Sequence, residues 1–345
     1  MSLLDEIREQ PRVLARLLAS QRDTAHAIAE RWRETAPTHV LIAARGTSDN
    51  AARYAQYLWG ERARLTVGLA APALFGPASA PPRLRGAVVV GISQSGASPD
   101  LVAVVAEARR QERPTLAITN DPGSPLARAA DQVLPLDAGP ERAVAATKTY
   151  TAQLAAVALV ASALAPGDGD ETALAALPDA VSAALRTDDE VATLARRWHT
   201  LDRCAVVGRG TGLATAHEWA LKLQELAYVL AQPSSTADFA HGPRAVVEPG
   251  FPVLGVATDG PLFADVVESL RGLKGSGART LVLSDRPDQL DGVADDVLAV
   301  PAGTPTWLDP IVSIVPAQLW CRHVALARGI DPEVPRGLSK ITRTW

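Results

Sequence analysis

Short, unbroken runs of apolar residues alternate along the chain with longer stretches in which apolar residues recur at helical spacing. The first run, HVLIAARG at 39–46, ends in a glycine and is followed by a helical stretch from about Asp49. The runs GAVVVGIS at 86–93, PTLAITND at 114–121 and DQVLPL at 131–136 repeat that form. Strands that are buried on both faces read as continuous apolar runs, so this alternation predicts an α/β fold with a parallel sheet.

The residues ahead of the first strand predict helices. Ser2 and Asp5 have the spacing of a capping box, in which each side chain bonds to the backbone amide of the other residue. Pro11 interrupts the helical pattern, and a second helical stretch runs to Glu34. We therefore expect an N-terminal helical segment over residues 1–36.

The chain repeats itself at a fixed distance. Residues 44–47, ARGT, match residues 208–211, GRGT, which lie 164 positions further on. Three pairs of identical residues have the same separation: Gly91 and Gly255, Asp121 and Asp285, and Asp131 and Asp295. A constant separation over about 90 residues indicates an internal duplication.

The duplication sets the domain boundaries that we expect. Two copies of one α/β domain span residues 37–165 and 200–330, each a parallel sheet flanked by helices in a flavodoxin-like three-layer sandwich. Residues 166–199 are rich in alanine and are expected to form a linker helix, and residues 331–345 form a C-terminal tail.

A polar loop between a predicted strand and the next helix is a candidate anion site. In GISQSGASPD, residues 91–100, Ser98 suits the N-cap and Pro99 the first helical position. The free amides and the dipole of such a helix attract an anion. The loop offers further side-chain donors from Ser93, Gln94 and Ser95. An ordinary capped helix is the alternative, and a nucleotide P-loop is excluded because its G-x-x-x-x-G-K-[ST] pattern is missing.

The second copy has different residues at the same place. Where the first copy has SQSG at 93–96, the second has ATDG at 257–260, so the serines are lost and a carboxylate is present that would repel phosphate. We therefore expect one anion site, in the first copy. Thr47 and Ser48 follow the first strand and carry hydroxyls that could reach the same ligand, although a helix cap explains them equally well.

The helix after Gly212 carries a group of charged residues. Glu218, Lys222 and Glu225 occur at i, i+4 and i+7 and therefore share one face of the helix. A salt-bridged surface face is the ordinary explanation of such a pattern. Alternatively, Lys222 lies between two carboxylates and orients one of them as a general base.

Two further polar segments are candidates for chemistry. His241 lies in DFAHGP at 238–243, a turn with glycine and proline, and a lone histidine in a loop is more often simply solvated. The segment PRGLSK at 335–340 is short and polar, and a frayed terminus is its simplest explanation.

Together these segments resemble the SIS-domain phosphosugar isomerase/deaminase family, and in particular the isomerase half of glutamine–fructose-6-phosphate aminotransferase. Six motifs match in order, so the resemblance covers the whole chain. They are EIREQP at 6–11 (E-I-x-E-Q-P in the family), ISQSG at 92–96 (I-S-Q-S-G), VAATK at 144–148 (V-A-S-T-K), ALKLQE at 220–225 (A-L-K-L-K-E), HGP at 241–243 (H-G-P) and PRGLSK at 335–340 (P-R-N-L-A-K).

The resemblance implies a role for each matching residue. Glu225 would move a proton between C1 and C2 of an open-chain sugar, and His241 would open the sugar ring from the neighbouring subunit of a homodimer. Lys340 would match a lysine that can form a Schiff base with an open-chain ketose, while Glu218 and Lys222 would shape the site. The resemblance places the remaining residues at the sugar 6-phosphate and the rest of the substrate: Thr47, Ser48, Ser93, Gln94, Ser95, Ser98, Val144, Ala146 and Thr147.

The chain departs from the family pattern at several positions. Ala146 replaces a serine, Gln224 a lysine and Asp238 a glutamate, which affects contacts to the sugar hydroxyls rather than the acid–base residues. The family's synthase has an N-terminal glutaminase domain that begins with cysteine after Met, whereas Ser2 follows Met1 here. We therefore expect that this chain makes no ammonia from glutamine unless another subunit does so.

Composition and charge narrow the class of protein. A chain of 345 residues with 47% apolar and 21% charged residues predicts about two domains and excludes disorder. The net charge of −4 argues against a nucleic-acid binder, and the two cysteines, Cys204 and Cys321, form neither a disulfide framework nor a usual zinc cluster. The best apolar run, 155–165, is too short to span a bilayer. We expect a cytoplasmic protein that needs no metal or redox cofactor and binds no membrane.

These observations favour an enzyme. The expected reaction converts an amino-sugar 6-phosphate similar to glucosamine 6-phosphate into a ketose 6-phosphate and ammonia by open-chain proton transfer. Without a glutaminase, mass action favours release of ammonia over its capture. The alternatives are a fructosamine-6-phosphate deglycase, a glutaminase-less aminotransferase-like isomerase and, less favoured, a non-catalytic phosphosugar sensor.

Overall fold

The computed structural model describes residues 2–76 and 80–340. Its first helices are α1 (Leu3–Arg8), α2 (Gln10–Ser20) and α3 (Arg22–Thr35). The predicted capping box is confirmed, because Asp5 N donates to Ser2 Oγ at 3.2 Å and Ser2 N donates to Asp5 Oδ2 at 2.8 Å. The helical pattern breaks at Glu9 rather than at Pro11, which lies in the first turn of α2, where proline is tolerated.

The first domain is built on a five-stranded parallel sheet. Its strand order is β2-β1-β3-β4-β5, with β1 (His39–Ala43), β2 (Thr66–Leu69), β3 (Ala87–Ser93), β4 (Thr115–Thr119) and β5 (Gln132–Pro135). Strands β1, β3, β4 and β5 coincide with the four predicted apolar runs. Strand β2 is short, partly exposed and at the edge of the sheet, so its sequence lacks the continuous apolar pattern of a buried strand.

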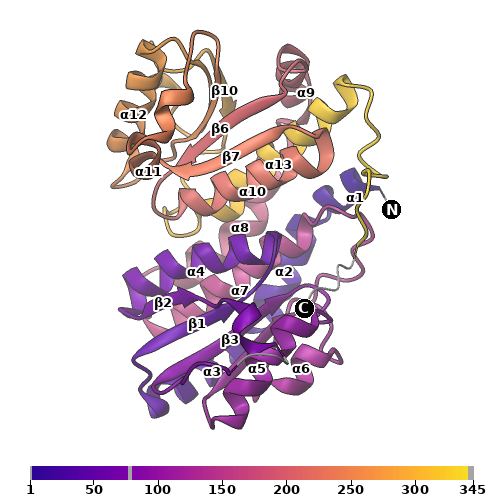
Figure 1. The fold of residues 1–345 in the computed structure, drawn as a ribbon, viewed down its shortest axis with the longest axis vertical. Helices are drawn as coiled ribbons and strands as arrows, with labels where there is room; N and C mark the ends of the chain where they lie inside the picture. The colour runs from indigo at the N-terminus through magenta and orange to yellow at the C-terminus, as the bar shows by residue number, and fades with distance from the viewer. Residues whose placement is uncertain (1, 77–79, 341–345) are drawn as a thin grey trace. The chain divides into compact units, whose positions relative to one another are not determined.

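Helices cover both faces of the first sheet (Figure 1). Helices α4 (Thr47–Ala63) and α7 (Lys148–Leu164) lie on one face, where α3 also packs against α7, and Trp32 meets Trp59 edge to face at 5.4 Å. The other face carries η1 (Pro72–Phe75), α5 (Pro99–Arg110) and α6 (Pro125–Ala129).

The second domain repeats this architecture. Its sheet is again parallel, with the order β10-β9-β8-β6-β7, and consists of β6 (Arg203–Gly208), β7 (Leu230–Ser235), β8 (Pro252–Val256), β9 (Arg279–Ser284) and β10 (Asp296–Ala299). Read from its first strand, each sheet has the order 2-1-3-4-5 of flavodoxin-like folds. The predicted fold class, two tandem copies of a parallel α/β sandwich, is therefore confirmed.

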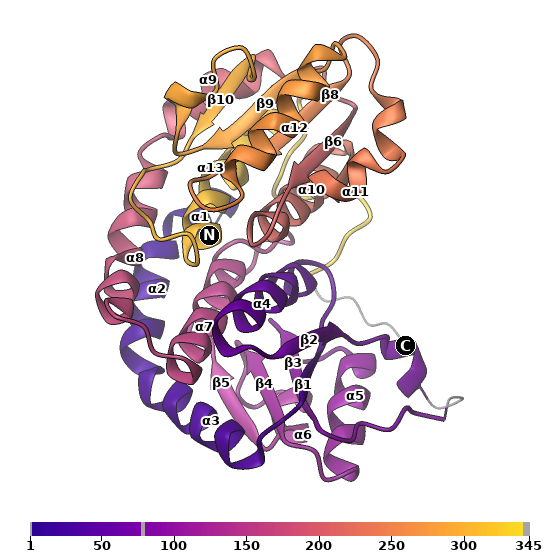
Figure 2. The same ribbon diagram turned by 90° about the vertical axis from the view of Figure 1, so that its left-hand side faces the viewer.

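Helices flank the second sheet as well. Helices α9 (Asp188–Arg197) and α10 (Gly212–Ala227) both pack against α13 (Asp309–Ala327), and Trp320 meets Trp219 edge to face at 5.6 Å. Figure 2 shows α12 (Phe263–Gly275) beside β8 and β9. The remaining elements are α8 (Asp170–Leu185), α11 (Thr236–Ala240), η2 (Pro243–Val246) and η3 (Pro287–Gln289).

The duplication extends to individual hydrogen bonds. In the first sheet, Asp131 Oδ2 accepts from Thr115 Oγ1 at 2.8 Å, and Asp131 N donates back to the same hydroxyl at 2.8 Å. Asp295 and Thr280 make the same pair of bonds in the second sheet, at 3.2 and 3.1 Å. The repeated aspartates Asp131 and Asp295 therefore make the same hydrogen bonds in both copies, and each links the start of one strand to its neighbour.

The contacts divide the chain into two compact units. The first-domain unit comprises residues 12–142 and 146–175 and the described residues from 339 onward, and the second-domain unit comprises residues up to 11, 143–145 and 176–338. The N-terminal helical segment and the expected linker are thus each divided between the units. Among the described residues, no helix combines the length and the apolar character that crossing a membrane requires.

Candidate functional site

Internal hydrogen bonds hold the polar loop between β3 and α5 in one shape and leave its hydroxyl donors available. Ser98 is the N-cap, as predicted, but its side chain makes no capping hydrogen bond, so this is not an ordinary side-chain cap. Ser93 Oγ accepts from Gly96 N at 3.1 Å, and Ser95 Oγ accepts from Ala97 N at 3.3 Å. Both hydroxyls act as acceptors within the loop and keep their own protons for another partner, such as a phosphate oxygen.

Gly96 is required at the bend of this loop. Its φ is +59°, and a Cβ atom at this position would lie 2.1 Å from Ser124 Oγ. Gly96 O also accepts from Leu126 N at 3.0 Å, which presses the loop onto the start of α6. Only glycine allows this close approach, so the loop geometry depends on one residue.

The loop after β1 lies at the same edge of the sheet as the loop after β3. The two strands pair in register from His39 with Ala87 to Ala43 with Gly91, so their carboxyl ends coincide. Arg45 joins the two loops through an ion pair with the buried carboxylate of Asp100, at 2.9 Å.

Thr47 and Ser48 do not cap α4, because Gly46 occupies the N-cap position. Thr47 is the first residue of the helix. Ser48 is buried, and its hydroxyl accepts from Gln153 Nε2 of α7 at 2.9 Å. The structure thus places both residues at the same edge of the sheet as the candidate phosphate loop, residues 93–98, with the Ser48 hydroxyl fixed by a second helix.

A buried carboxylate that the sequence did not single out organises the loop before α7. Glu141 Oε1 accepts from the backbone amides of Thr147 and Thr149, at 3.0 and 3.1 Å. Glu141 Oε2 accepts from Thr149 Oγ1 at 2.7 Å and from Lys340 Nζ at 2.7 Å. Lys340, the family's Schiff-base position, is therefore anchored in the first-domain unit by Glu141.

Glu141 carries a negative charge in this arrangement. Burial by itself raises the pKa of its carboxyl, but the Lys340 ammonium and the hydrogen bonds from Thr147 and Thr149 outweigh burial, so that the pKa is lowered. A single glutamate in a loop gives no sequence signal. The only indication was its position three residues before Val144, the start of the matching V-A-x-T-K motif.

The other residues of the V-A-x-T-K motif are divided between the two units. Thr147 is buried at the start of α7, and Ala146 beside it is partly exposed; both belong to the first-domain unit. Val144 is partly exposed and packs with the second-domain unit, where the neighbouring Ala143 N donates to Glu6 Oε2 at 3.1 Å. Substrate contacts of Val144, Ala146 and Thr147 stay predictions.

Helix α10 carries a buried lysine between two carboxylates. Lys222 and Glu218 are almost completely buried, with Lys222 Nζ 3.4 Å from Glu218 Oε1. Lys222 Nζ also donates to Glu225 Oε2, and the Glu225 side chain is 24% exposed. The three residues do share one face, as predicted, but it is not a surface face. The cost of burying such charges is offset only by close pairing, so Lys222 holds the exposed carboxylate of Glu225 in one place.

The C-terminal tail is anchored within the second-domain unit rather than frayed. The carboxylate of Glu333 accepts from the Leu3 amide, at 3.0 and 2.9 Å. Further along, Arg336 N donates to the Tyr228 hydroxyl at 2.7 Å, and the Arg336 guanidinium lies 4.6 Å from the centre of the Tyr228 ring. Tyr228 ends α10, three residues after Glu225, so the tail is attached where the candidate base lies.

His241 lies on an exposed turn of the second-domain unit. It ends α11, and every residue from His241 to Val246 is exposed. The start of that short helix is fixed by Ser235, whose hydroxyl accepts from Asp238 N at 2.9 Å. Among the described residues, no hydrogen bond or ion pair engages the His241 ring. Its role in ring opening stays a prediction.

In the second copy, residues 257–260 correspond to the candidate phosphate loop, and the donors of this loop are hydrogen-bonded to acidic side chains. Asp259 N donates to Asp285 Oδ1 at 2.8 Å, and Thr258 Oγ1 donates to Asp309 Oδ2 at 2.8 Å. Arg286 pairs with the Asp259 carboxylate at 2.5 Å. Amide, hydroxyl and guanidinium are therefore already engaged by acids, which supports a single anion site in the first copy.

Asp309 has an unusual protonation equilibrium in this cluster. It lies at the start of α13 and is fully buried, and this burial raises the pKa of its carboxyl to about 7. The nearby charge of Asp285 acts in the same direction, against hydrogen bonds from Thr258 and Ser313.

The described residues contain no group of three or more histidine, cysteine, aspartate or glutamate side chains that could hold a metal ion. Cys204 and Cys321 are both buried, and burial raises the pKa of each thiol. Neither thiol is therefore placed to act as a nucleophile.

Comparison with known proteins identifies the repeated unit. The SIS domain family matches residues 35–163 and 200–328, which is once over each sheet. The chain belongs to the SIS domain family. Both SIS domains follow the two-copy organisation that the repeated residues predicted.

The similarity to known proteins extends over nearly the whole of this chain, beyond a single SIS domain. A glutamine–fructose-6-phosphate aminotransferase (isomerizing) of Thermococcus kodakarensis is 34% identical over 347 residues, which is 98% of this chain and 57% of that protein. The tandem SIS chain thus spans little more than half the length of this relative. The match is to its isomerase half, as the motifs indicated.

Two solved structures are similar to this chain over almost its whole length. A proposed phosphosugar isomerase of Silicibacter pomeroyi is 32% identical with a TM-score of 0.85, and the alignment covers 96% of this chain and 100% of that chain. The C-terminal domain of the Francisella tularensis glucosamine–fructose-6-phosphate aminotransferase is 27% identical with a TM-score of 0.86, covering 96% and 98%.

The substitution Gly96→Ala tests the phosphate loop. It introduces a clash with Ser124 and a left-handed alanine, and we expect binding of a hexose 6-phosphate at this loop to weaken at least about tenfold in isothermal titration calorimetry. The matched control is Gly260→Ala in the second copy, where φ is +146° and a Cβ would lie 2.8 Å from Thr306 Cγ2. Both variants should lose stability, but only the first should lose this binding event. Equal weakening by both would refute the assignment.

The substitution Asp309→Asn tests the buried acid. Because the pKa is raised to about 7 in the folded state, the native protein holds a proton that the unfolded chain releases above about pH 4. Asp309 therefore lowers the free energy of unfolding as pH rises from about 4 to 7, by about 4 kcal/mol in full. The asparagine variant should melt at a higher temperature than the wild type at pH 8 and at a similar one at pH 4. The exposed Asp291→Asn is the control, and an unchanged pH dependence of melting would contradict the assignment.

Proposed function

We propose that this chain is a phosphosugar isomerase/deaminase that converts an amino-sugar 6-phosphate into a ketose 6-phosphate and ammonia. The observation that carries the proposal is the buried Lys222, which holds the partly exposed carboxylate of Glu225 on α10. A carboxylate fixed in this way can take a proton from one carbon and return it to the next. The likeness to isomerase halves of aminotransferases supports the same chemistry.

The first SIS domain binds the phosphate end of the substrate in this proposal. Ser93 and Ser95 offer hydroxyl protons, Ser98 has a side chain that its helix does not use, and α5 adds the positive end of its dipole. A phosphate dianion at this point needs no metal ion, because hydroxyl and amide donors satisfy its oxygens. Gln94 and Thr47 complete the set of donors.

The reaction runs on the open-chain form of the sugar. Glu225 takes the proton from C2, which carries the amino group, and the electrons of that C–H bond form a C1–C2 double bond while the C1 carbonyl oxygen takes a proton from solvent and becomes a hydroxyl. Glu225 then returns its proton to C1, which leaves an iminium ion at C2. Addition of water at C2 and loss of ammonia and one proton to solvent give the ketose 6-phosphate, with no net oxidation or reduction.

Lys340 offers a second route for release of the amine. In its pair with Glu141 it is an ammonium ion, which donates hydrogen bonds but is not a nucleophile. Once it has lost a proton, its amine can attack C2 and expel ammonia, and water then hydrolyses the new imine. Glu141 keeps the lysine tail attached to the domain that binds the phosphate.

His241 would act in a partner subunit. The exposed turn from His241 to Val246 supports this role, because an imidazole that projects into solvent can enter a neighbouring site. The histidine would donate a proton to the ring oxygen as the sugar opens. The proposal therefore includes a homodimer with active sites shared between chains. A cytoplasmic location also stays a prediction.

An ammonia-release assay over a panel of phosphorylated sugars tests the function. Amino-sugar 6-phosphates should release ammonia and yield a ketose 6-phosphate. A preference for fructosamine 6-phosphates would instead make the chain a deglycase. Isomerisation of the sugar phosphate without ammonia release would identify an aminotransferase-like isomerase, and binding without turnover of any substrate would identify a sensor.

The substitution Glu225→Gln should reduce turnover by more than about 100-fold, because glutamine is nearly isosteric but cannot accept the proton from carbon. Affinity for the phosphosugar, measured by calorimetry, should be largely unchanged. Glu190→Gln, at an exposed glutamate of α9, is the matched control and should retain activity. Full activity of Glu225→Gln would remove this residue from the mechanism.

Mixing two inactive variants tests the shared site. In a mixed dimer of Glu225→Gln and His241→Ala, both substitutions can fall in one composite site, which leaves the other site intact. After subunit exchange, each mixed dimer should recover about half of the wild-type turnover. If exchange is verified and no activity returns, each chain completes its own site and the model is wrong.

A further inference from the structure

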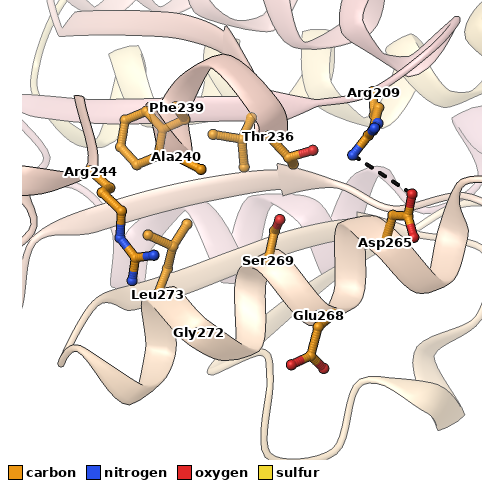
Figure 3. Close-up of a pocket in the computed structure, with 11 residues that line it drawn as sticks. Arg209, Thr236, Phe239, Ala240, Arg244, Asp265, Glu268, Ser269, Gly272 and Leu273 are labelled. Carbon is orange, nitrogen blue, oxygen red and sulfur yellow. Dashed lines mark ion pairs between the residues drawn. The ribbon is translucent and has the colours of Figure 1, made fainter. Parts of the chain in front are cut away.

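The second SIS domain contains a pocket that the proposed reaction does not use. It lies between α12 on one side and α11 with the end of β6 on the other, and has a volume of about 470 Å³ (Figure 3). This volume is within the usual range for small-molecule sites. The pocket belongs to the second-domain unit alone, and neither Glu225 nor the phosphate loop lines it.

A buried hydroxyl without a partner lines this pocket. Thr236 is only 4% exposed, and its Oγ1 has no hydrogen-bond partner in the described part of the chain. A buried hydroxyl that makes no hydrogen bond is costly, so proteins rarely retain one without a function. Figure 3 shows the hydroxyl of Ser269, on α12, directed toward Thr236 on the other side of the pocket. The two side chains therefore offer a pair of donors to a molecule bound between them.

The charges around the pocket leave one cation unmatched. Asp265 pairs with Arg209 at 3.6 Å, and Glu268 pairs with Arg271 of its own helix at 2.6 Å. Figure 3 shows Glu268 directed away from the pocket and Arg244 at the end opposite Arg209. Arg244 makes no side-chain hydrogen bond or ion pair with any described residue. With the other charges paired, Arg244 is the cation that the pocket offers to an anion.

The first copy shows how the pocket arose. Asp100 and Asp265 are equivalent, because each pairs with the arginine that follows the first strand of its sheet. Counted from these aspartates, Ser269 stands where the first copy has Val104, which is completely buried in the core. By the same count, Gly272 stands where the first copy has Glu107. A polar residue thus replaces a core valine, and a glycine replaces a glutamate that pairs with Arg110 and Gln111 in the first domain.

We propose that this pocket is a second binding site, for the phosphate ester of a small ring compound. Arg244 supplies a planar guanidinium fork that fits phosphate oxygens, and the hydroxyls of Thr236 and Ser269 donate to the same group. Phe239 and Leu273 form an apolar floor on which a sugar or base ring can lie. Such a ligand would occupy a site separate from the catalytic one and is suited to regulate the enzyme.

Binding is measured in the Gly96→Ala background, in which binding at the candidate phosphate loop of the first domain is expected to be weakened. The probes are inorganic phosphate, a hexose 6-phosphate and a nucleoside 5′-monophosphate, titrated by calorimetry into the full chain. One binding event per chain should remain for at least one of the two esters and should be weaker for phosphate alone. A ring preference between the two esters then distinguishes a sugar from a nucleotide ligand.

Two glycines of α12 provide a matched pair of variants. A Cβ atom at either Gly272 or Gly275 would meet no atom within 4 Å, but only Gly272 lines the pocket. Gly272→Phe should therefore abolish the remaining binding event, and Gly275→Phe should leave it unchanged. Arg244→Gln should weaken it by about tenfold or more. Absence of the event, or its persistence in Gly272→Phe, would overturn the proposal.

A structural measurement separates this site from any residual binding at the first loop. Tungstate, a phosphate mimic with strong anomalous scattering, should give a peak beside Arg244 in crystals of the Gly96→Ala protein and none in crystals that also carry Gly272→Phe. A peak at residues 93–98 alone would refute the second site. Neither result depends on ammonia release, so this proposal and the proposed function can fail independently.

Discussion

The geometry of a parallel sheet wound in two directions determines where chemistry can occur in this protein. In the order 2-1-3-4-5, the chain leaves the first and third strands toward opposite faces, so that the loops after them diverge at one edge of the sheet. Helices α4 and α5 both begin at this edge in the first domain, and their amino ends carry hydroxyls, free amides and a favourable dipole. No other edge of the sheet collects such groups, because the opposite edge receives helix carboxyl ends.

The same edge exists twice, and the two copies differ in what occupies it. In the first copy a glycine bend and two serines keep donors available. In the second copy Asp259, Asp285 and Asp309 engage the amide, the hydroxyl and a neighbouring arginine. Burial of Asp309 is tolerated because its pKa is raised, so that the acid remains largely protonated up to about neutral pH. The two copies therefore share one frame but differ in the residues at this edge, and the second copy also has the pocket beside Arg244.

Burying the charged Lys222 side chain costs desolvation free energy, which its pairs with two carboxylates offset. Lys222 lies between Glu218 and Glu225 on a helix packed into the second domain, and removing the lysine would leave the buried carboxylate of Glu218 without this compensating charge. A salt-bridged surface would not require this burial. The pairing holds Glu225 in one orientation, which the proposed transfer of a proton between adjacent carbons would require.

The local sequence was sufficient for the duplication, the parallel strands β1, β3, β4 and β5, the capping box at Ser2 and the shared face of Glu218, Lys222 and Glu225. The duplication is visible as a constant spacing between identical residues, and the other features depend on burial or spacing within a few residues. The edge strand β2, the Glu141–Lys340 pair and the hydrogen bond from Thr258 to Asp309 could not be predicted in this way. The residues of these two pairs are 199 and 51 positions apart, and only the packing of helices against the sheets brings them together. Sequence patterns thus determined the frame and the residue types at its edge, whereas the tertiary structure decided which charges meet, because the energy of an ion pair depends on a separation of a few ångströms that no local pattern encodes.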